Sequence, residues 1–262
     1  MNKKPQGEEY PLYGGDITLK YQPGKHIYSI GDGDKEKGVY GVTGVTGILP
    51  KDWMAGYVRK HAKLYLNDTP ISLVGDITKH INNALMASYY HGKRAAQIGT
   101  NVHQAVQNWL ENDARELLES KEEENSLLAF GLFIKDNKLG TIFSERKCLY
   151  MSVSKGKLKD PVYAGTVDWI GLLNGKRTII DWKTSKGIYS SHIMQANAYA
   201  CAINREIEFS PKLKKKIGGE IEQIAIVRLG KNGKLETIIQ KVGDIKVFLH
   251  LLEVKNYLST NK

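Results

Sequence analysis

Cysteine is scarce in this chain. Its 262 residues include two, Cys148 and Cys201. Two thiols cannot form a four-cysteine zinc site, and they cannot hold an iron–sulfur cluster without other ligands. Both stand among apolar neighbours, so we expect plain core residues and no iron–sulfur cluster.

Long apolar runs are also missing. No stretch approaches the roughly 20 residues that a membrane-spanning helix needs. The first residues, MNKKPQGEEYPLYGG, lack the apolar core of a secretory signal peptide. We therefore expect a cytoplasmic protein without a membrane partner.

Acidic residues are outnumbered, 28 against 38 Lys and Arg, which gives a formal net charge of +10. Because Lys and Arg release counterions when they contact phosphates, this balance favours a polyanionic partner such as nucleic acid. No Ser-His-Asp or Cys-His arrangement stands out. A GxxxxGK[ST] phosphate loop is absent, so the sequence encodes no use of ATP.

The most informative stretch is a predicted hairpin, GTVDWIGLL (165–173) and KRTIIDWKTS (176–185) around Asn174-Gly175. Asn-Gly between apolar, β-branched runs is the strongest short-range hairpin signal, because a type I′ turn needs positive φ at both positions. Such a turn places Asp168 directly opposite Asp181. Lys183 leaves the strand on the same side as Asp181.

Two facing carboxylates repel each other unless they share a partner, and a divalent cation is the usual one. The opposite face, with Val167, Trp169, Ile180 and Trp182, is expected to be core. The alternative is an ordinary solvated polar face. Ile170 and Ile179 lie on the acidic side and argue against it, whereas a register slip of one residue would reverse the faces.

A candidate histidine precedes the hairpin. Gly99, Val102, His103 and Val106 follow helical spacing, so His103 is expected on the core side of a helix. It is either a hydrogen-bonded core residue or a metal ligand. After the hairpin, Gln195 and Tyr199 are spaced i, i+4 and share a helical face, either as amphipathic packing or as a substrate-orienting pair.

Together, Gly-x-x-x-His, GTVD, IIDWK and Q-x-x-x-Y resemble the PD-(D/E)XK nuclease superfamily in its RecB-like branch, similar to phage-type and mitochondrial genome maintenance exonucleases. The resemblance covers roughly residues 98–203. It implies that His103, Asp168, Asp181 and the carbonyl of Trp182 bind Mg²⁺ or Mn²⁺. It further implies that Lys183 contacts the phosphate or the attacking water, and that Gln195 and Tyr199 complete the catalytic set.

The implied activity is metal-dependent hydrolysis of DNA phosphodiester bonds by an exonuclease acting at single-stranded or duplex ends. The alternatives are an endonuclease of the same fold and a catalytically inactive nucleic-acid-binding protein. DNA, single strands included, is the expected partner. Replication or recombination proteins are further candidate partners, and a phage genome is a candidate source.

Other residues have open roles. Glu145 either reaches the metal region or pairs with Arg146 or Lys147. The tract GVTGVTG (41–47) either holds a phosphate or forms a glycine-rich turn, and the basic loop 154–161 either flanks DNA or is simply solvated. The candidate nucleic-acid-binding lysines, otherwise merely exposed, are Lys186, Lys212, Lys214, Lys215 and Lys216.

The expected fold class is α/β, with a PD-(D/E)XK (restriction-endonuclease-like) αβββαβ core, a central mixed sheet and a mostly helical N-terminal lobe. We expect a flexible segment over 1–15, the lobe over 16–92 and the core over 93–262. Expected helices cover 53–66, 71–90, 93–118, 127–133, 190–203 and 244–258. Expected strands outside the hairpin cover 17–28, 38–45, 140–153, 221–229 and 234–241.

Overall fold

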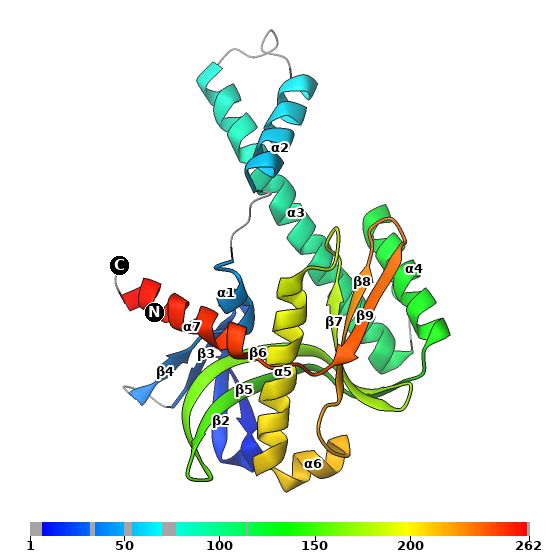
Figure 1. Cartoon of the computed structure of the whole chain (residues 1–262). Helices are drawn as coiled ribbons and strands as arrows, with labels where there is room; N and C mark the ends of the chain where they lie inside the picture. The colour runs from blue at the N-terminus through cyan, green and yellow to red at the C-terminus, as the bar shows by residue number, and fades with distance from the viewer. Residues whose placement is uncertain (1–6, 32–34, 50–53, 70–76, 114, 261–262) are drawn as a thin grey trace, which may run out of the picture.

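The core of the protein is a five-stranded mixed sheet with helices on both faces (Figure 1). The computed structural model describes residues 7–31, 35–49, 54–69, 77–113 and 115–260. The strands run in the order β5 (Leu139–Ser154), β6 (Lys157–Leu173), β7 (Lys176–Lys183), β8 (Gln223–Leu229) and β9 (Leu235–Lys241). Neighbours are antiparallel except β7 and β8, which are parallel. The expectation of an α/β fold with a central mixed sheet is confirmed.

The predicted hairpin and its register are confirmed. Asn174 and Gly175 have φ of 52° and 84°, as a type I′ turn requires. The β6–β7 pairs include Trp169↔Ile180 and Ile170↔Ile179.

Both faces of the central sheet are core. One face packs against α5 (Ser190–Phe209) and α7 (Lys246–Thr260), and it includes Ile170 and Ile179. The other packs against α3 (Ile77–Asn112) and α4 (Lys121–Asp136), and it includes Trp169, Ile180 and Trp182. Val167 packs on the α5 side, so its predicted place beside Trp169 is wrong. Val167 and Trp169 therefore lie in different core clusters although they are two residues apart on β6, and the paired strand β5 has a positive φ of 48° at Glu145 between their partners.

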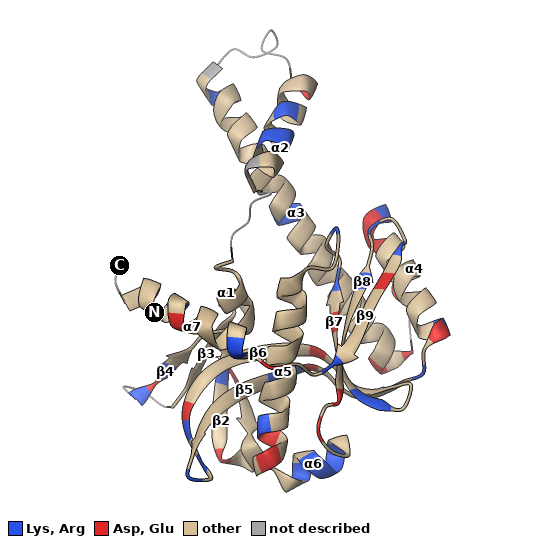
Figure 2. Ribbon diagram, in the orientation of Figure 1, with Lys and Arg blue, Asp and Glu red and all other residues tan. Residues whose placement is uncertain are grey.

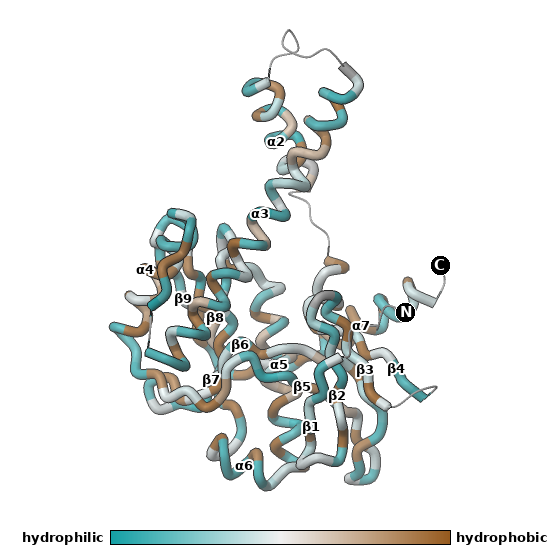
Figure 3. Tube along the Cα trace, turned by 180° about the vertical axis from the view of Figure 1, so that it is seen from behind, coloured by the Kyte–Doolittle hydropathy of each residue, from teal (hydrophilic) through white to brown (hydrophobic). Residues whose placement is uncertain are grey.

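A second, antiparallel sheet precedes the core: β1 (Glu8–Leu12), β2 (Ile17–Gln22), β3 (Ile27–Ile30) and β4 (Lys37–Val39), with short 3₁₀ turns η1 (Tyr13–Gly15) and η2 (Pro23–Lys25). Figure 3 shows it from behind, beside β5 and β6. Leu12 and Tyr13 are buried against Leu149 of β5. The expected flexibility over 1–15 is therefore wrong for residues 8–15, because apolar side chains anchor them to the core. The lobe combines the strands β2, β3 and β4 with helices that make up most of its described residues.

Helix α3 is continuous from Ile77 to Asn112, although two helices were expected there. A single glycine such as Gly92 costs a helix only about 1 kcal/mol, which packing offsets. α2 (Met54–Asp68) packs along the first part of α3. The expected boundary between lobe and core at 92/93 thus falls inside a helix. No helix of the described residues is both long and apolar enough to cross a membrane.

Three charged segments, among them most of the basic loop expected over 154–161, belong to helices or strands. Residues 121–124 are the first turn of α4, where Ser120 and Glu123 form a capping box. Residues 157–161 belong to β6, because the chain reverses at Lys155-Gly156. Residues 211–217 form α6 (Pro211–Ile217), capped by the Ser210 hydroxyl.

Candidate metal centre

The site forms where β6 and β7 separate. The last paired residues of the hairpin are Trp169 and Ile180. Beyond them, Asp168 Oδ2 accepts a hydrogen bond of 2.9 Å from the backbone amide of Trp182. Asp168 and Asp181 therefore follow the predicted register but are not a ladder pair. A residue's N–H and C=O point to the same side of a strand. The Trp182 carbonyl, a predicted ligand, thus also points towards β6.

Asp168 also faces Glu145 on its other side. Glu145 lies between the pairs Ser144↔Trp169 and Arg146↔Val167, which places it across from Asp168. Its positive φ of 48° costs a non-glycine residue about 1–2 kcal/mol. Such strain is concentrated at functional sites.

His103 of α3 completes this group. Its Nδ1 lies 3.6 Å from Asp168 Oδ2. One ligand atom each from His103, Glu145 and Asp168 lie within 4.8 Å of one another. Two carboxylates and an imidazole are a donor set that suits Mn²⁺, and the oxygens suit Mg²⁺. Of the two roles considered for Glu145, the structure favours the metal region, since Arg146 pairs with Glu206 instead.

Asp181 and Lys183 form a buried ion pair beside this group. Lys183 Nζ donates a hydrogen bond of 2.9 Å to Asp181 Oδ1. Oδ2 lies 2.8 Å from the same nitrogen, but it is buried without a properly directed hydrogen bond. Because a hydrogen bond depends on direction as well as distance, this oxygen keeps an unused lone pair. It is available to a cation.

Burial and mutual repulsion shape the electrostatics. Burial raises the pKa of Glu145 to about 7, reinforced by the charge of Asp168 and opposed by His103 and Lys147. Burial likewise raises the pKa of Asp181 to about 6, although Lys183 opposes the rise. Burial lowers the pKa of Lys183, but the charges of Asp181 and Asp168 outweigh burial, and the net shift is upward. A divalent cation would relieve this repulsion, so the donor set fits one.

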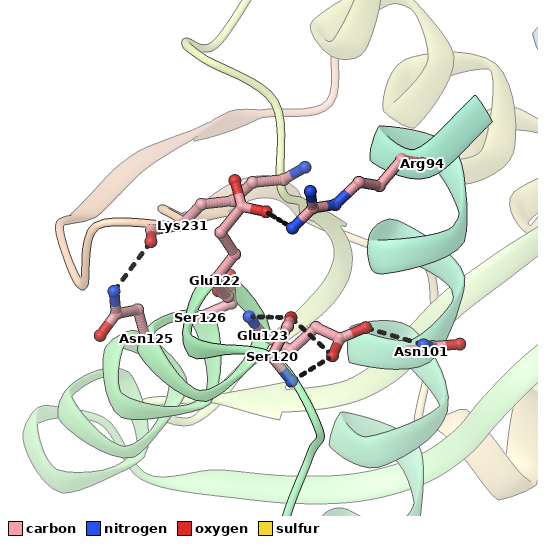
Figure 4. A network of polar contacts seen from close by, with 8 residues as sticks. All are labelled: Arg94, Asn101, Ser120, Glu122, Glu123, Asn125, Ser126 and Lys231. Atoms are coloured by element: carbon pink, nitrogen blue, oxygen red, sulfur yellow. Dashed lines mark hydrogen bonds and ion pairs between the residues drawn. The ribbon is translucent and has the colours of Figure 1, made fainter. Parts of the chain in front are cut away.

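Helix α3 is held in place around His103. A Cβ on Gly99 would lie 3.3 Å from the hydroxyl of Thr184, so glycine allows the loop after β7 to approach the helix. Asn101 donates a hydrogen bond of 2.7 Å to the buried Glu123, which also belongs to the Ser120 capping box (Figure 4). These interactions fix α3 against α4.

Gln195 and Tyr199 share one face of α5, as predicted, and both are buried. Gln195 Nε2 donates to Thr46 Oγ1 at 2.7 Å, and Tyr199 forms a side-chain hydrogen bond with Thr43. Both threonines belong to α1 (Val42–Thr46). The pair therefore binds the Gly-Val-Thr tract here, and its part in catalysis stays a prediction.

The predicted nucleic-acid-binding lysines lie in two places. Lys186 lies in the loop after β7, and its Nζ is 5.8 Å from the ring centroid of Tyr57 in α2. Lys212, Lys214, Lys215 and Lys216 lie on α6, after the 20-residue α5 (Figure 2). That helix is about 30 Å long. Lys216 Nζ lies 4.1 Å from the centroid of the Phe143 ring on β5, and no ion pair or hydrogen bond among the described residues joins the α6 lysines to the metal centre.

Two features around the centre were not predicted from the sequence. Thr43 and Thr46 hold Gln195 and Tyr199, and their i, i+3 spacing was the available signal. Lys147 is buried, with Nζ 4.6 Å from the Tyr21 ring centroid and 3.5 Å from the Glu145 carbonyl. Nothing local in the sequence indicates that β1 and β2 cover this lysine.

No protein-family model matches this chain, and no curated protein matches it. Among solved structures, the chain is similar to the protein described as SSO0001, known from a crystal structure. The two share 18% sequence identity over 63% of this chain and 70% of that one, with a TM-score of 0.33. A likeness of this size carries no inference about activity.

Proposed function

We propose that this protein is a Mg²⁺- or Mn²⁺-dependent deoxyribonuclease that hydrolyses DNA phosphodiester bonds. One observation carries the proposal: His103, Glu145 and Asp168 converge within 4.8 Å, next to the Asp181–Lys183 pair. Acidic ligands for a hard cation beside a buried ammonium group are the components that phosphodiester hydrolysis needs.

The order of elements supports a PD-(D/E)XK core. From α3 and α4 the chain continues through β5, β6 and β7 to α5, the short α6 and then β8. This is the αβββαβ order expected from the motif resemblance. Asp168 lies on the second of those strands, and Asp181 and Lys183 lie on the third, where that resemblance expects them.

The residues divide the work by their chemistry. His103, Glu145 and Asp168 would hold the metal ion; Asp181, which lies outside this group of three, and the Trp182 carbonyl are the further oxygen donors that the motif resemblance implies. A bound divalent cation supplies Lewis acidity and lowers the pKa of water. Lys183, kept protonated by Asp181, stabilises the negative charge that develops on the phosphoryl oxygens. The hydrogen bond from Trp182 fixes the rotamer of Asp168.

We favour an exonuclease acting at single-stranded or duplex ends, a choice that rests on the motif resemblance alone. An endonuclease of the same fold would use the same residues. A catalytically inactive nucleic-acid-binding protein would have no need to keep two acids, one buried and one half-buried, whose pKa values are raised by burial and by the charge of Asp168.

The test is cleavage of end-labelled single- and double-stranded DNA in Mg²⁺, Mn²⁺ or EDTA. We expect cleavage with either metal and none in EDTA. The variants Asp168→Asn and Lys183→Met should each be slower by about 100-fold or more. Lys138→Gln, an exposed change at the far end of the hairpin, is the matched control.

Metal-dependent cleavage that survives both substitutions would place the chemistry elsewhere. Circular single-stranded DNA separates the two nuclease classes, because an exonuclease needs an end and an endonuclease does not. If every DNA substrate stays intact while the protein still binds it, the inactive binding protein is the correct assignment.

A further inference from the structure

α2 and the first part of α3 project from the core as a pair of helices (Figures 1 and 3). We call residues 54–68 and 77–98 the arm. The arm is continuous with the metal centre, because α3 runs on from it to His103. Lys186, three residues after Lys183, contacts the arm through the ring of Tyr57.

The charge of the arm is one-sided. Its Lys and Arg residues are Arg59, Lys60, Lys63, Lys79, Lys93 and Arg94, and Asp68 is its one acid. Arg59, Lys60 and Lys63 form no ion pair with any residue in the described part of the chain. The same three line a hollow of about 360 Å³ on α2. Unpaired cations around a hollow favour an anionic ligand.

Exposed aromatic rings lie on α3 of the same arm. Tyr89 and Tyr90 are 57% and 60% exposed, far more than a tyrosine that only fills a core. Tyr90 lines a second hollow of about 440 Å³ between α2 and α3, together with Tyr65, Asn83, His91 and the one acid of the arm, Asp68. Leu64 lines both hollows, so they adjoin. Rings beside a cationic groove are how proteins hold unpaired bases.

Other occupants fit less well. A second copy of the chain would bring two surfaces of the same positive charge together, which opposes association. An acidic protein would satisfy the cations but gives no reason for the exposed tyrosines. A duplex keeps its bases stacked inside, away from Tyr90. A single strand uses both features.

We propose that the arm binds single-stranded nucleic acid, with phosphates on Arg59, Lys60 and Lys63 and a base against Tyr90. Delivery of this strand to the metal centre rests on the proposed function, whereas binding to the arm does not. Helix α3 rises about 20 Å from Tyr90 to His103 at 1.5 Å per residue. A strand spaced at about 3.4 Å per nucleotide needs about six nucleotides to span that distance.

The experiment is fluorescence anisotropy in EDTA, which removes cleavage from the measurement. The probes are labelled oligothymidylates of about 4 and about 12 nucleotides and a duplex of the longer length. The variants are Arg59→Gln/Lys60→Gln/Lys63→Gln and Tyr90→Ala. The control, Lys135→Gln/Lys138→Gln/Lys176→Gln, removes the same charge from exposed positions near the Asn174-Gly175 turn. Circular dichroism confirms that each variant is folded.

We expect both arm variants to weaken binding of the longer strand by about tenfold or more, and the control to leave it within about twofold. The triple arm variant should also lower the salt dependence, by about one unit of slope for each phosphate that it no longer binds. The shorter strand reaches the arm but not the metal centre, and it should lose affinity in the same two variants. Equal losses in arm variants and control would overturn the proposal. The proposal would also be overturned if the wild-type protein were a dimer and Tyr90→Ala converted it to a monomer, because the ring would then serve self-association. If the arm binds the longer strand in EDTA but the protein cleaves no DNA in Mg²⁺ or Mn²⁺, the proposed role of the arm stands and the proposed nuclease activity is rejected.

Discussion

The carboxylate of Asp168 accepts a hydrogen bond of 2.9 Å from the backbone amide of Trp182. This side chain therefore both closes the end of the β6–β7 ladder and faces the metal centre. This double role separates two substitutions. Asp168→Asn keeps an acceptor for the amide, and we expect near-native stability with lost activity. Asp168→Ala leaves the amide without a partner and should lower the free energy of unfolding by about 1–3 kcal/mol.

Urea denaturation of both variants, followed by circular dichroism, checks this prediction. An alanine variant as stable as the asparagine variant would mean that the hydrogen bond contributes nothing to the separation of β6 and β7.

Glu123 is expected to matter for stability through α3 and α4. It is buried, closes the capping box with Ser120 and accepts from Asn101 (Figure 4). Glu123→Ala should lower the free energy of unfolding by about 0.5–2 kcal/mol. Glu122→Gln, in an exposed ion pair with Arg94, should cost no more than about 0.5 kcal/mol. Equal losses in the two variants, measured by urea denaturation, would contradict this prediction.

Gly165 is predicted to be irreplaceable for steric reasons. A Cβ there would lie 2.5 Å from Cε1 of the buried Tyr199. Gly165→Ala should destabilise the fold by about 1–3 kcal/mol through overpacking. Ala164→Gly, at the neighbouring position, removes a methyl group without creating a clash. If the midpoint of thermal denaturation is the same for Gly165→Ala as for the wild type, the ring of Tyr199 moves away freely.

His192 should make the folded state less stable as the pH drops below neutrality, whereas the raised pKa values of Glu145 and Asp181 act in the opposite direction. Burial, assisted by the charge of Lys183, lowers the pKa of His192 to about 4. Between about pH 6.5 and pH 4 the unfolded chain therefore binds this proton more readily than the folded chain, which favours unfolding. The stability of His192→Gln relative to the wild type should therefore be higher at about pH 5 than at about pH 7. Urea midpoints of both proteins at the two pH values measure this difference, and an identical change in both proteins would exclude His192.

The turn at Asn174-Gly175 was readable because its signal is local, and it determined the register of Trp169 with Ile180. The position of Glu145 across from Asp168 could not be predicted from local sequence, because it depends on the β5–β6 register and its irregularities. The continuity of α3 through Gly92 likewise depends on packing against α2. Local chemistry thus predicted the acids and the lysine, and tertiary pairing decided which of them converge.

The most direct test of the metal centre is an anomalous difference map from crystals soaked in Mn²⁺. We predict a peak between His103 Nδ1 or Nε2, Glu145 and Asp168, within ligand distance of Asp181, and no such peak for Asp168→Asn. A protein that cleaves DNA with Mn²⁺ but holds the ion away from these residues would contradict the assignment.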